Sequence, residues 1–256
     1  MNEEIQQAYE DKNLAEFEEE IGIEFSNKST LVQAFIHRSY INENNNFPLN
    51  HNERLEFLGD AVLELSVTEH LFQNYLNPEG ELTNWRAALV NADMCARVAR
   101  ELDMNPHLFL SKGEAQDKDS KARDYILSNT TEAVIGAIYV DKDFETADEF
   151  IRKFIIDKLP EVLEQGLWMD PKSRFQEAAQ DEVGITPTYD VIQEEGPDHD
   201  KTFLVGVYLN DEKVATGTGS SKQEAQEQAA EKGMKVKGWS GPDVQVQPRE
   251  SEDRLG

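Results

Sequence analysis

Apolar residues recur every three to four positions along most of the first 159 residues, which is the spacing of amphipathic helices. Stretches rich in Asn, Gly and Pro interrupt this pattern and separate one helix from the next. The pattern predicts helices near residues 3–21, 29–40, 52–76, 82–102, 123–141 and 144–158. Residues 1–159 are therefore predicted to form an all-α domain.

The pattern changes after Pro160. Residues 160–170 are predicted to be a linker, and residues 171–183 an amphipathic helix. Three β-type runs follow, at residues 186–193, 201–210 and 213–220, and then a helix that Ser221 is expected to cap. The order α-β-β-β-α predicts a small α+β domain over residues 171–238. The polar tail, residues 239–256, has two prolines and no periodicity, so it is predicted to be disordered.

Three carboxylates lie on one side of the predicted helix 52–76. At about 100° per residue, Glu53, Glu56 and Asp60 fall within a sector about 60° wide. Carboxylates on a helix usually face water. This helix, however, is apolar on its other sides and is expected to lie inside the domain. Because an unpaired buried charge is costly, these carboxylates are expected to have a partner, and a divalent cation is the natural one.

A second predicted helix, residues 123–141, offers matching oxygen atoms. Asn129 and Glu132 share one face of this helix, and around the helix axis Gly136 lies between them. Because glycine has no Cβ, it would let another helix approach this face closely. The oxygen-bearing side chains expected to converge are Glu56, Asp60, Asn129 and Glu132, with Glu53 at the edge. Ligation by oxygen alone suits magnesium or manganese rather than zinc. Two such cations held together support phosphodiester hydrolysis.

The segments "HNERLEFLGDAVL", "PEGELTNWRAALVN" and "SNTTEAVIGAIYVD" resemble the signature segments of the ribonuclease III family, and the similarity covers most of residues 20–240. The resemblance implies a homodimeric endonuclease that cleaves double-stranded RNA and leaves 5′-phosphate and 3′-hydroxyl ends. Ribosomal RNA precursors and other structured RNA are the substrates that it implies. Mg²⁺ is the expected cofactor, Mn²⁺ is a possible substitute, and no small-molecule cofactor is expected.

The resemblance also implies roles for individual residues. The metal ligands would be Glu56, Asp60, Asn129 and Glu132, the catalytic groups Asp60, Glu132 and Glu53, and the residues around a second metal Glu53 and Glu79. Phe57 matches the family's aromatic dimer contact, with plain core packing as the alternative.

Asn129 departs from the family pattern, which usually has Asp at this position. The amide keeps an oxygen ligand but removes one negative charge, so we expect activity with a weaker affinity for magnesium. A catalytically impaired scaffold that binds double-stranded RNA is the alternative, and only Asn129 supports it. A helical nucleotide hydrolase would also use the carboxylates, but it leaves the C-terminal domain unexplained.

The C-terminal segments "PKSRFQEAAQ", "PTYDVIQEEGPDHDKTFLVGV" and "GTGSSKQEAQEQAAE" resemble a double-stranded RNA-binding domain. By this resemblance, Gln176 and Glu177 address one minor groove and His199 the next. Lys222 would meet phosphate at the start of the last helix, or would simply be solvated there. The basic loop at residues 111–123, which includes Arg123, would either touch the RNA backbone or face solvent.

Charge and composition qualify this picture. The net charge of −26 argues against binding nucleic acid in general, but local arrangement decides. Residues 170–238 hold 8 basic and 14 acidic residues, so their binding to RNA is expected to be modest and dependent on salt. The single cysteine, Cys95, excludes an internal disulfide framework and fits a reducing compartment. No signal-peptide or membrane segment is evident, so a cytoplasmic protein without a membrane partner is predicted.

Overall fold

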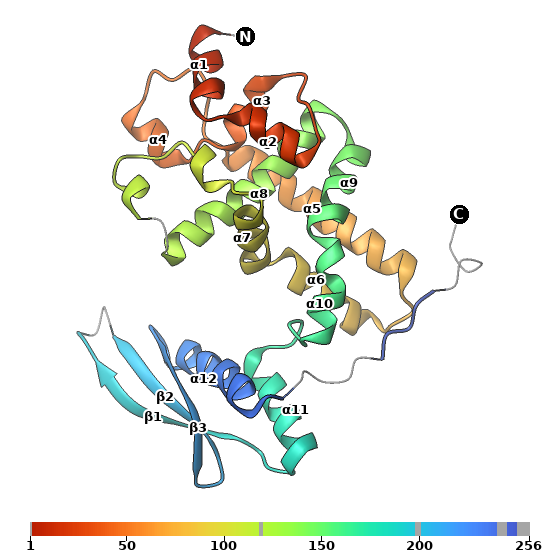
Figure 1. The fold of residues 1–256 in the computed structure, drawn as a ribbon, viewed down its shortest axis with the longest axis vertical. Helices are drawn as coiled ribbons and strands as arrows, with labels where there is room; N and C mark the ends of the chain where they lie inside the picture. Colours follow the sequence, from red (N-terminus) through yellow and green to blue (C-terminus); the bar gives the residue numbers. More distant parts are fainter. Residues whose placement is uncertain (1, 118–119, 198–200, 240–244, 250–256) are drawn as a thin grey trace. The chain divides into compact units, whose positions relative to one another are not determined.

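The computed structural model describes residues 2–117, 120–197, 201–239 and 245–249. The chain forms two compact units (Figure 1). One consists of Met1–Leu159 together with Gln247–Gly256, and the other is Pro160–Val246. The shorter unit is therefore inserted between two segments of the longer one.

The longer unit is helical in its described residues, as the apolar periodicity predicts. Its α-helices are α1 (Glu3–Asp11), α2 (Leu14–Ile21), α3 (Lys28–Ala34), α4 (Arg38–Glu43), α5 (Glu53–Asn74), α6 (Glu79–Val90), α7 (Ala92–Glu101), α8 (Lys121–Asp141) and α9 (Phe144–Phe154). Short 3-10 turns lie at Asn105–His107, Glu114–Gln116 and Ile156–Lys158.

Three of the predicted helices are each two helices in the structure, because residues that favour helix ends lie inside them. Asn13 takes a left-handed conformation, with φ of 49°, between α1 and α2. The side chain of Asn91 accepts a hydrogen bond from the Met94 N–H and so begins α7. Between α3 and α4 the chain straightens, and Ile36 forms a parallel bridge with Phe109. Periodicity alone does not reveal such interruptions.

Helices α5 and α8 pack against each other at the centre of the helical unit. Leu63, Val67 and Leu71, which continue the carboxylate sector of α5, are buried. The expectation that α5 is buried on all sides is nevertheless wrong, because Phe57 is 81% exposed and Leu65 56% exposed. One face of α5 is thus covered by the unit, and another is apolar and exposed.

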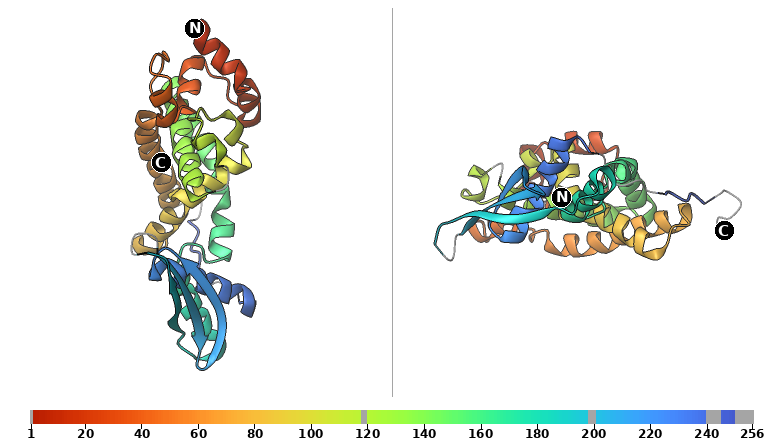
Figure 2. Two further views of the ribbon diagram at one scale, coloured as in Figure 1. Left: turned by 90° about the vertical axis from the view of Figure 1, so that its left-hand side faces the viewer. Right: turned by 90° about the horizontal axis from the view of Figure 1, so that it is seen from below.

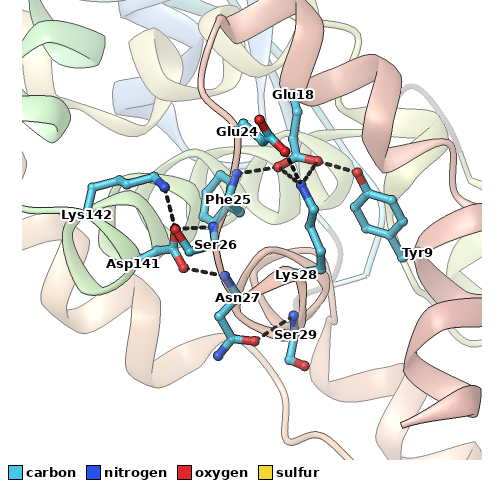
Figure 3. Close-up of polar contacts among 10 residues, drawn as sticks. All are labelled: Tyr9, Glu18, Glu24, Phe25, Ser26, Asn27, Lys28, Ser29, Asp141 and Lys142. Atoms are coloured by element: carbon cyan, nitrogen blue, oxygen red, sulfur yellow. Dashed lines mark hydrogen bonds and ion pairs between the residues drawn. The ribbon is translucent and has the colours of Figure 1, made fainter. Parts of the chain in front are cut away.

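A buried carboxylate fixes the N-terminal helices. Glu18 on α2 accepts hydrogen bonds from the Tyr9 hydroxyl on α1, from the Phe25 N–H and from the Lys28 ammonium group (Figure 3). Burial and the neighbouring Glu18 raise the pKa of Tyr9 well above its usual value, so the phenol keeps its proton. The charge of Glu18 is therefore compensated inside the unit.

A second carboxylate joins this region to the end of α8. Asp141 accepts hydrogen bonds of 2.7 Å from the N–H groups of Ser26 and Asn27 (Figure 3). Burial alone would raise the pKa of Asp141, but these bonds and the Lys142 ammonium group hold it below its usual range. The C-terminal end of α8 is therefore fixed against the loop that follows α2.

The shorter unit begins within α10 (Leu159–Glu164) and contains α11 (Pro171–Val183), β1 (Thr188–Glu195), β2 (Thr202–Leu209), β3 (Glu212–Gly219) and α12 (Lys222–Lys237). The strands form an antiparallel sheet in the order β1-β2-β3, in which Val205 of β2 lies opposite Val191 and Gly217. Helices α11 and α12 pack on one face of this sheet (Figure 2). The predicted α-β-β-β-α module is confirmed.

Details of the shorter unit explain its packing. Phe175 of α11 and Met234 of α12 share a core with Val207 of β2. A Cβ at Gly217 would lie 2.2 Å from the Ala225 carbonyl oxygen, so glycine is required where α12 crosses β3. Ser221 caps α12 as predicted, accepting a hydrogen bond from the Glu224 N–H.

Two segments differ from the predicted linker and tail. Helix α10 occupies the start of the stretch predicted to be a linker. Within the tail predicted to be disordered, Pro248 forms an antiparallel bridge with Tyr75 of the helical unit. Backbone pairing of this kind is set by the partner segment and leaves no periodic signal in a short polar tail.

Candidate metal centre

The candidate site is built where α5 crosses α8. A Cβ placed on Gly59 would lie 1.8 Å from the Glu132 carbonyl oxygen, and one placed on Gly136 would lie 2.1 Å from the Leu55 carbonyl oxygen. Real Cβ atoms do not approach other atoms so closely, so the two backbones touch only because both residues are glycines. This contact fixes which turns of the two helices face each other.

The crossing brings together carboxylates from distant parts of the sequence. Glu56 and Asp60 flank Gly59 on α5, and both lie close enough to Glu132 of α8 to raise its pKa. Asn129 lies one turn before Glu132 on α8 and is half-buried. The predicted meeting of the two helices at these faces is therefore what the structure shows.

Burial and mutual repulsion define the electrostatics of the cluster. Burial, followed by the charges of Asp60 and Glu56, raises the pKa of Glu132 to about 7. Burial, followed by the charges of Glu53 and Asp60, also raises the pKa of Glu56. Within the described residues, neither Glu56, Asp60 nor Glu132 has an ion pair or a side-chain hydrogen bond. The cluster thus carries negative charge that the chain itself does not neutralise.

These properties fit a divalent cation. Three carboxylates and one amide supply only oxygen donors, which hard cations such as magnesium and manganese prefer. In the described part of the chain, no three His, Cys, Asp or Glu side chains stand close enough together to hold an ion as they are. Like charges repel at short range, so we expect the carboxylates to close in only around a cation.

Glu53 lies at the edge of this cluster, as the sequence predicts. Its carboxylate is about half exposed and lies 3.7 Å from both Arg38 and His51. Glu53 contributes to the raised pKa of Glu56, so its charge reaches the cluster. Unlike Glu56, Asp60 and Glu132, Glu53 has basic partners among the described residues.

Glu79, which the family resemblance places around a second metal, does not join the cluster within one chain. It is the first residue of α6, beyond the C-terminal end of α5. Asp60 lies near the N-terminal end of α5, and the 14 residues from Asp60 to Asn74 rise by about 21 Å. Glu79 instead lines a hollow beside Tyr75 and Arg86.

Phe57 lies on the outer face of α5. Its side chain is 81% exposed, so the alternative of core packing is wrong. Leu65 and Phe72 follow on the same face and are about half exposed. A row of large exposed apolar side chains on one helix is typical of an interaction surface.

The predicted RNA contacts lie on the shorter unit. Gln176 and Glu177 are exposed on α11, so they are accessible to a ligand. Lys222, the first residue of α12, lies 2.9 Å from Glu194 and packs over the Phe203 ring. The hydrogen bond from Lys222 lowers the pKa of Glu194. A phosphate would have to compete with Glu194 for the Lys222 ammonium group, and His199 lies outside the described residues.

Arg123, in the basic loop considered for RNA contacts, has a structural role instead. Its side chain is only 3% exposed and donates hydrogen bonds to the carbonyl oxygens of Asp117 and Glu114 and to the side chain of Asn105. Arg123 therefore holds the loop before α8 in place and does not reach a ligand.

Sequence reasoning identified Gly136 but missed its partner, Gly59. A glycine inside a long helix lowers the stability of the helix by about 1 kcal/mol relative to alanine. This unfavourable residue within the predicted helix was the sequence signal that could have revealed the contact.

Behind the cluster, Cys95 of α7 is fully buried, and burial raises the pKa of its thiol to about 12. Its carbonyl oxygen accepts a hydrogen bond from Thr131 of α8, so Cys95 supports the site without being reactive.

Together these features define a two-domain protein in which a helical unit with a cluster of carboxylates at the crossing of α5 and α8 is joined to an α-β-β-β-α module. The family model described as ribonuclease-III-like matches residues 27–159, and the double-stranded RNA binding motif matches residues 171–237. The chain belongs to the ribonuclease III family, whose members are endoribonucleases for double-stranded RNA that require a divalent metal.

Two relatives agree with this assignment in sequence. Ribonuclease 3 of a Nitratiruptor species is 42% identical over 226 residues, which are 88% of this chain and 97% of the relative. Ribonuclease 3 of Bacillus cereus is 43% identical over 220 residues, 86% of this chain and 89% of the relative. A nuclease-domain structure of Campylobacter jejuni ribonuclease III is 36% identical, with a TM-score of 0.49, and covers 56% of this chain and 96% of that chain.

The structure also bears on the predicted lack of a membrane segment. Among the helices of the described residues, none is long and apolar enough to cross a bilayer.

Proposed function

We propose that the chain hydrolyses phosphodiester bonds of double-stranded RNA at the cluster of Glu56, Asp60, Asn129 and Glu132, with Mg²⁺ as the cofactor. The products are 5′-phosphate and 3′-hydroxyl ends. The observation that carries this proposal is the convergence of three carboxylates, without a basic partner among the described residues, at the crossing of α5 and α8.

Each residue has a distinct part in this proposal. Bound divalent cations supply an activated water and stabilise the leaving oxygen of the phosphodiester. Glu56 and Asp60 hold the positive charge from α5, and Asn129 adds a neutral carbonyl oxygen from α8. Glu132, whose pKa is about 7, gives up its proton when a cation approaches, so it binds metal most strongly above neutral pH.

A second copy of the chain is the proposed occupant of the apolar face of α5. Phe57 and Leu65 are exposed along one side of this helix, which a symmetric homodimer would bury. One structure of the C. jejuni nuclease domain is described as showing flexibility in a region involved in dimer formation. Because Glu79 does not reach the cluster within one chain, its proposed role beside a second metal requires the partner copy to supply it.

The α-β-β-β-α module is proposed to hold the RNA by its shape. Gln176 and Glu177 would contact a minor groove, and Lys222 would exchange Glu194 for a phosphate. His199 is proposed to contact the next minor groove. We propose ribosomal RNA precursors and other structured RNA as substrates, and the cytoplasm as the location.

A catalytically impaired RNA-binding scaffold is the second candidate, because Asn129 replaces the usual carboxylate. Incubation of the purified chain with duplex RNA and Mg²⁺ separates the two functions. The enzyme predicts cut products bearing 5′-phosphates, their loss in Glu132→Ala, and their retention in Glu149→Ala, which removes an exposed carboxylate of α9. A gel shift without cleavage by the unaltered chain would favour the scaffold.

A further inference from the structure

Residues 247–249 lie against the turn that joins α5 to α6, and they pair with it through backbone hydrogen bonds. The Leu76 N–H donates to the Gln247 carbonyl oxygen at 2.7 Å. The Arg249 N–H donates to the Asn74 carbonyl oxygen, also at 2.7 Å. Two reciprocal bonds of this length are the repeating unit of an antiparallel ladder. The tail therefore forms a single antiparallel bridge with the helical unit.

The sequence of the tail suits this pairing. Pro248 lies opposite Tyr75, and the two hydrogen bonds flank this pair rather than join its members. Proline has no N–H to donate, so it is tolerated in a strand only where none is needed. Tyr75 itself has extended dihedral angles, with φ of −131° and ψ of 143°, so the turn presents a strand-like edge.

Side chains on both partners add to the backbone pairing. The Gln247 N–H donates to the Asn77 side-chain oxygen at 2.9 Å, and Asn77 is buried. The Arg249 guanidinium group lies 5.3 Å from the centre of the Phe72 ring, within the range of a cation–π contact. Each of the three tail residues thus has its own partner on the turn.

The docking edge packs against a buried ring and borders a hollow. The Tyr75 ring packs edge-on against Trp85, with 5.4 Å between the ring centres, and Trp85 is fully buried. Beside the edge is a hollow of about 480 Å³, lined by residues that include Leu71, Leu82 and Arg249. Backbone pairing beside a partly apolar hollow is a feature of sites that bind extended peptides.

We infer that the turn Asn74–Asn77 is a docking site for an extended peptide, and that residues 247–249 of the same chain are its ligand. The chain leaves the helical unit after Leu159 and returns to it at Gln247. Docking therefore attaches the shorter unit, which carries the proposed RNA contacts, to the helical unit at both ends of the shorter unit. A second attachment limits the module's travel and raises its effective concentration near the nuclease unit.

Docking of residues 247–249 to the turn does not depend on RNA cleavage. Only the effect of docking on how the shorter unit presents RNA rests on the proposed function. Amide hydrogen exchange at Leu76 is the direct measurement, because this N–H is bonded to Gln247. We would compare the full chain with a variant that ends at Val246, which lacks the docking residues. A variant that ends at Glu250 keeps them and is the matched control.

The expected result is slow exchange at Leu76 in the full chain and in the variant ending at Glu250. In the variant ending at Val246, exchange should be at least about tenfold faster, which corresponds to about 1.4 kcal/mol. The amide of Val67, inside α5, should not change, which shows that the unit stays folded. Arg249→Ala should give an intermediate rate, because it removes the contact with Phe72 and leaves the backbone pairing in place.

Equal exchange at Leu76 in all the chains would overturn the inference. Protection that disappears on dilution of the full chain would also overturn it, because the ligand would then come from a second copy. Neither result depends on activity, so a chain that fails to cut RNA can still support the docking site.

Discussion

Gly59 of α5 and Gly136 of α8 face each other across a backbone contact in which neither position has room for a Cβ. The contact decides which side chains meet at the candidate metal centre. Glu56 and Asp60 lie on either side of Gly59, and Glu132 lies one turn before Gly136. Two glycines, which have no functional side chain, therefore set how closely the carboxylates of α5 approach the carboxylate of Glu132.

Gly59→Ala should destabilise the chain by at least about 2 kcal/mol, because the new methyl group meets backbone rather than a flexible side chain. Gly80→Ala is the matched control, since a Cβ there meets nothing within 4 Å. That change should be neutral or stabilising by about 0.5–1 kcal/mol. Denaturant unfolding measures both, and equal stabilities for the two variants would argue against the tight crossing.

Glu132→Gln should stabilise the metal-free chain at pH 8. Because the folded pKa of Glu132 is about 7, above its usual value of 4.5, protonation favours the folded state. This stabilisation is fully present below pH 4.5 and is lost as the pH rises through 7. Above pH 7 we expect the variant to be more stable by on the order of 1–3 kcal/mol.

Thermal unfolding of both chains between pH 5 and 8, with and without Mg²⁺, tests this expectation. Added cation should stabilise the unaltered chain more than the variant, because only the former regains a charged ligand. A variant that is less stable than the unaltered chain at pH 8 without metal would contradict a destabilising charge at Glu132.

Phe57→Ala should weaken the proposed homodimer while leaving the fold of each chain intact, because the ring is 81% exposed. Phe150→Ala is the contrasting control, since this ring is only 2% exposed and its loss should cost about 3–5 kcal/mol of stability. Analytical ultracentrifugation measures the dimer, and circular dichroism measures the fold. An unchanged dimer dissociation constant in Phe57→Ala would place the interface elsewhere.

Asn129→Asp should lower the magnesium concentration needed for half-maximal cleavage of duplex RNA. The substitution adds a negative charge to a cluster that already lacks a basic partner within the described residues, so a cation is held more tightly. Cleavage rates over a range of Mg²⁺ concentrations check this expectation. The same half-maximal concentration for both chains would show that Asn129 does not limit metal affinity.

The sequence predicted the fold class and the packing of α5 against α8 at the faces that carry the carboxylates, because helical periodicity and the face of each carboxylate are local properties. It did not predict the breaks at Asn13 and Asn91, where one residue stops a helix whose apolar pattern continues. The apolar pattern alone did not decide between a core and an interface for Phe57, since it is the same in both, and only the family resemblance favoured the exposed position that the structure shows.

The remaining features depend on tertiary contacts. The family resemblance groups Glu79 with the metal residues, and only the fold shows that the length of α5 separates it from them within one chain. Arg123 looked like part of a basic loop, and only the fold shows that loop carbonyls surround it. Pro248 lies in a polar tail whose partner, Tyr75, is far away in the sequence.

Binding of Mn²⁺ to the purified chain, followed by electron paramagnetic resonance without RNA, tests the central claim most directly. The chain should bind the ion saturably, and Glu132→Gln should bind it at least about tenfold more weakly, a loss of about 1.4 kcal/mol. Glu149→Gln, on the exposed side of α9, should bind like the unaltered chain. Equal binding by all three chains would contradict a metal centre at the crossing of α5 and α8.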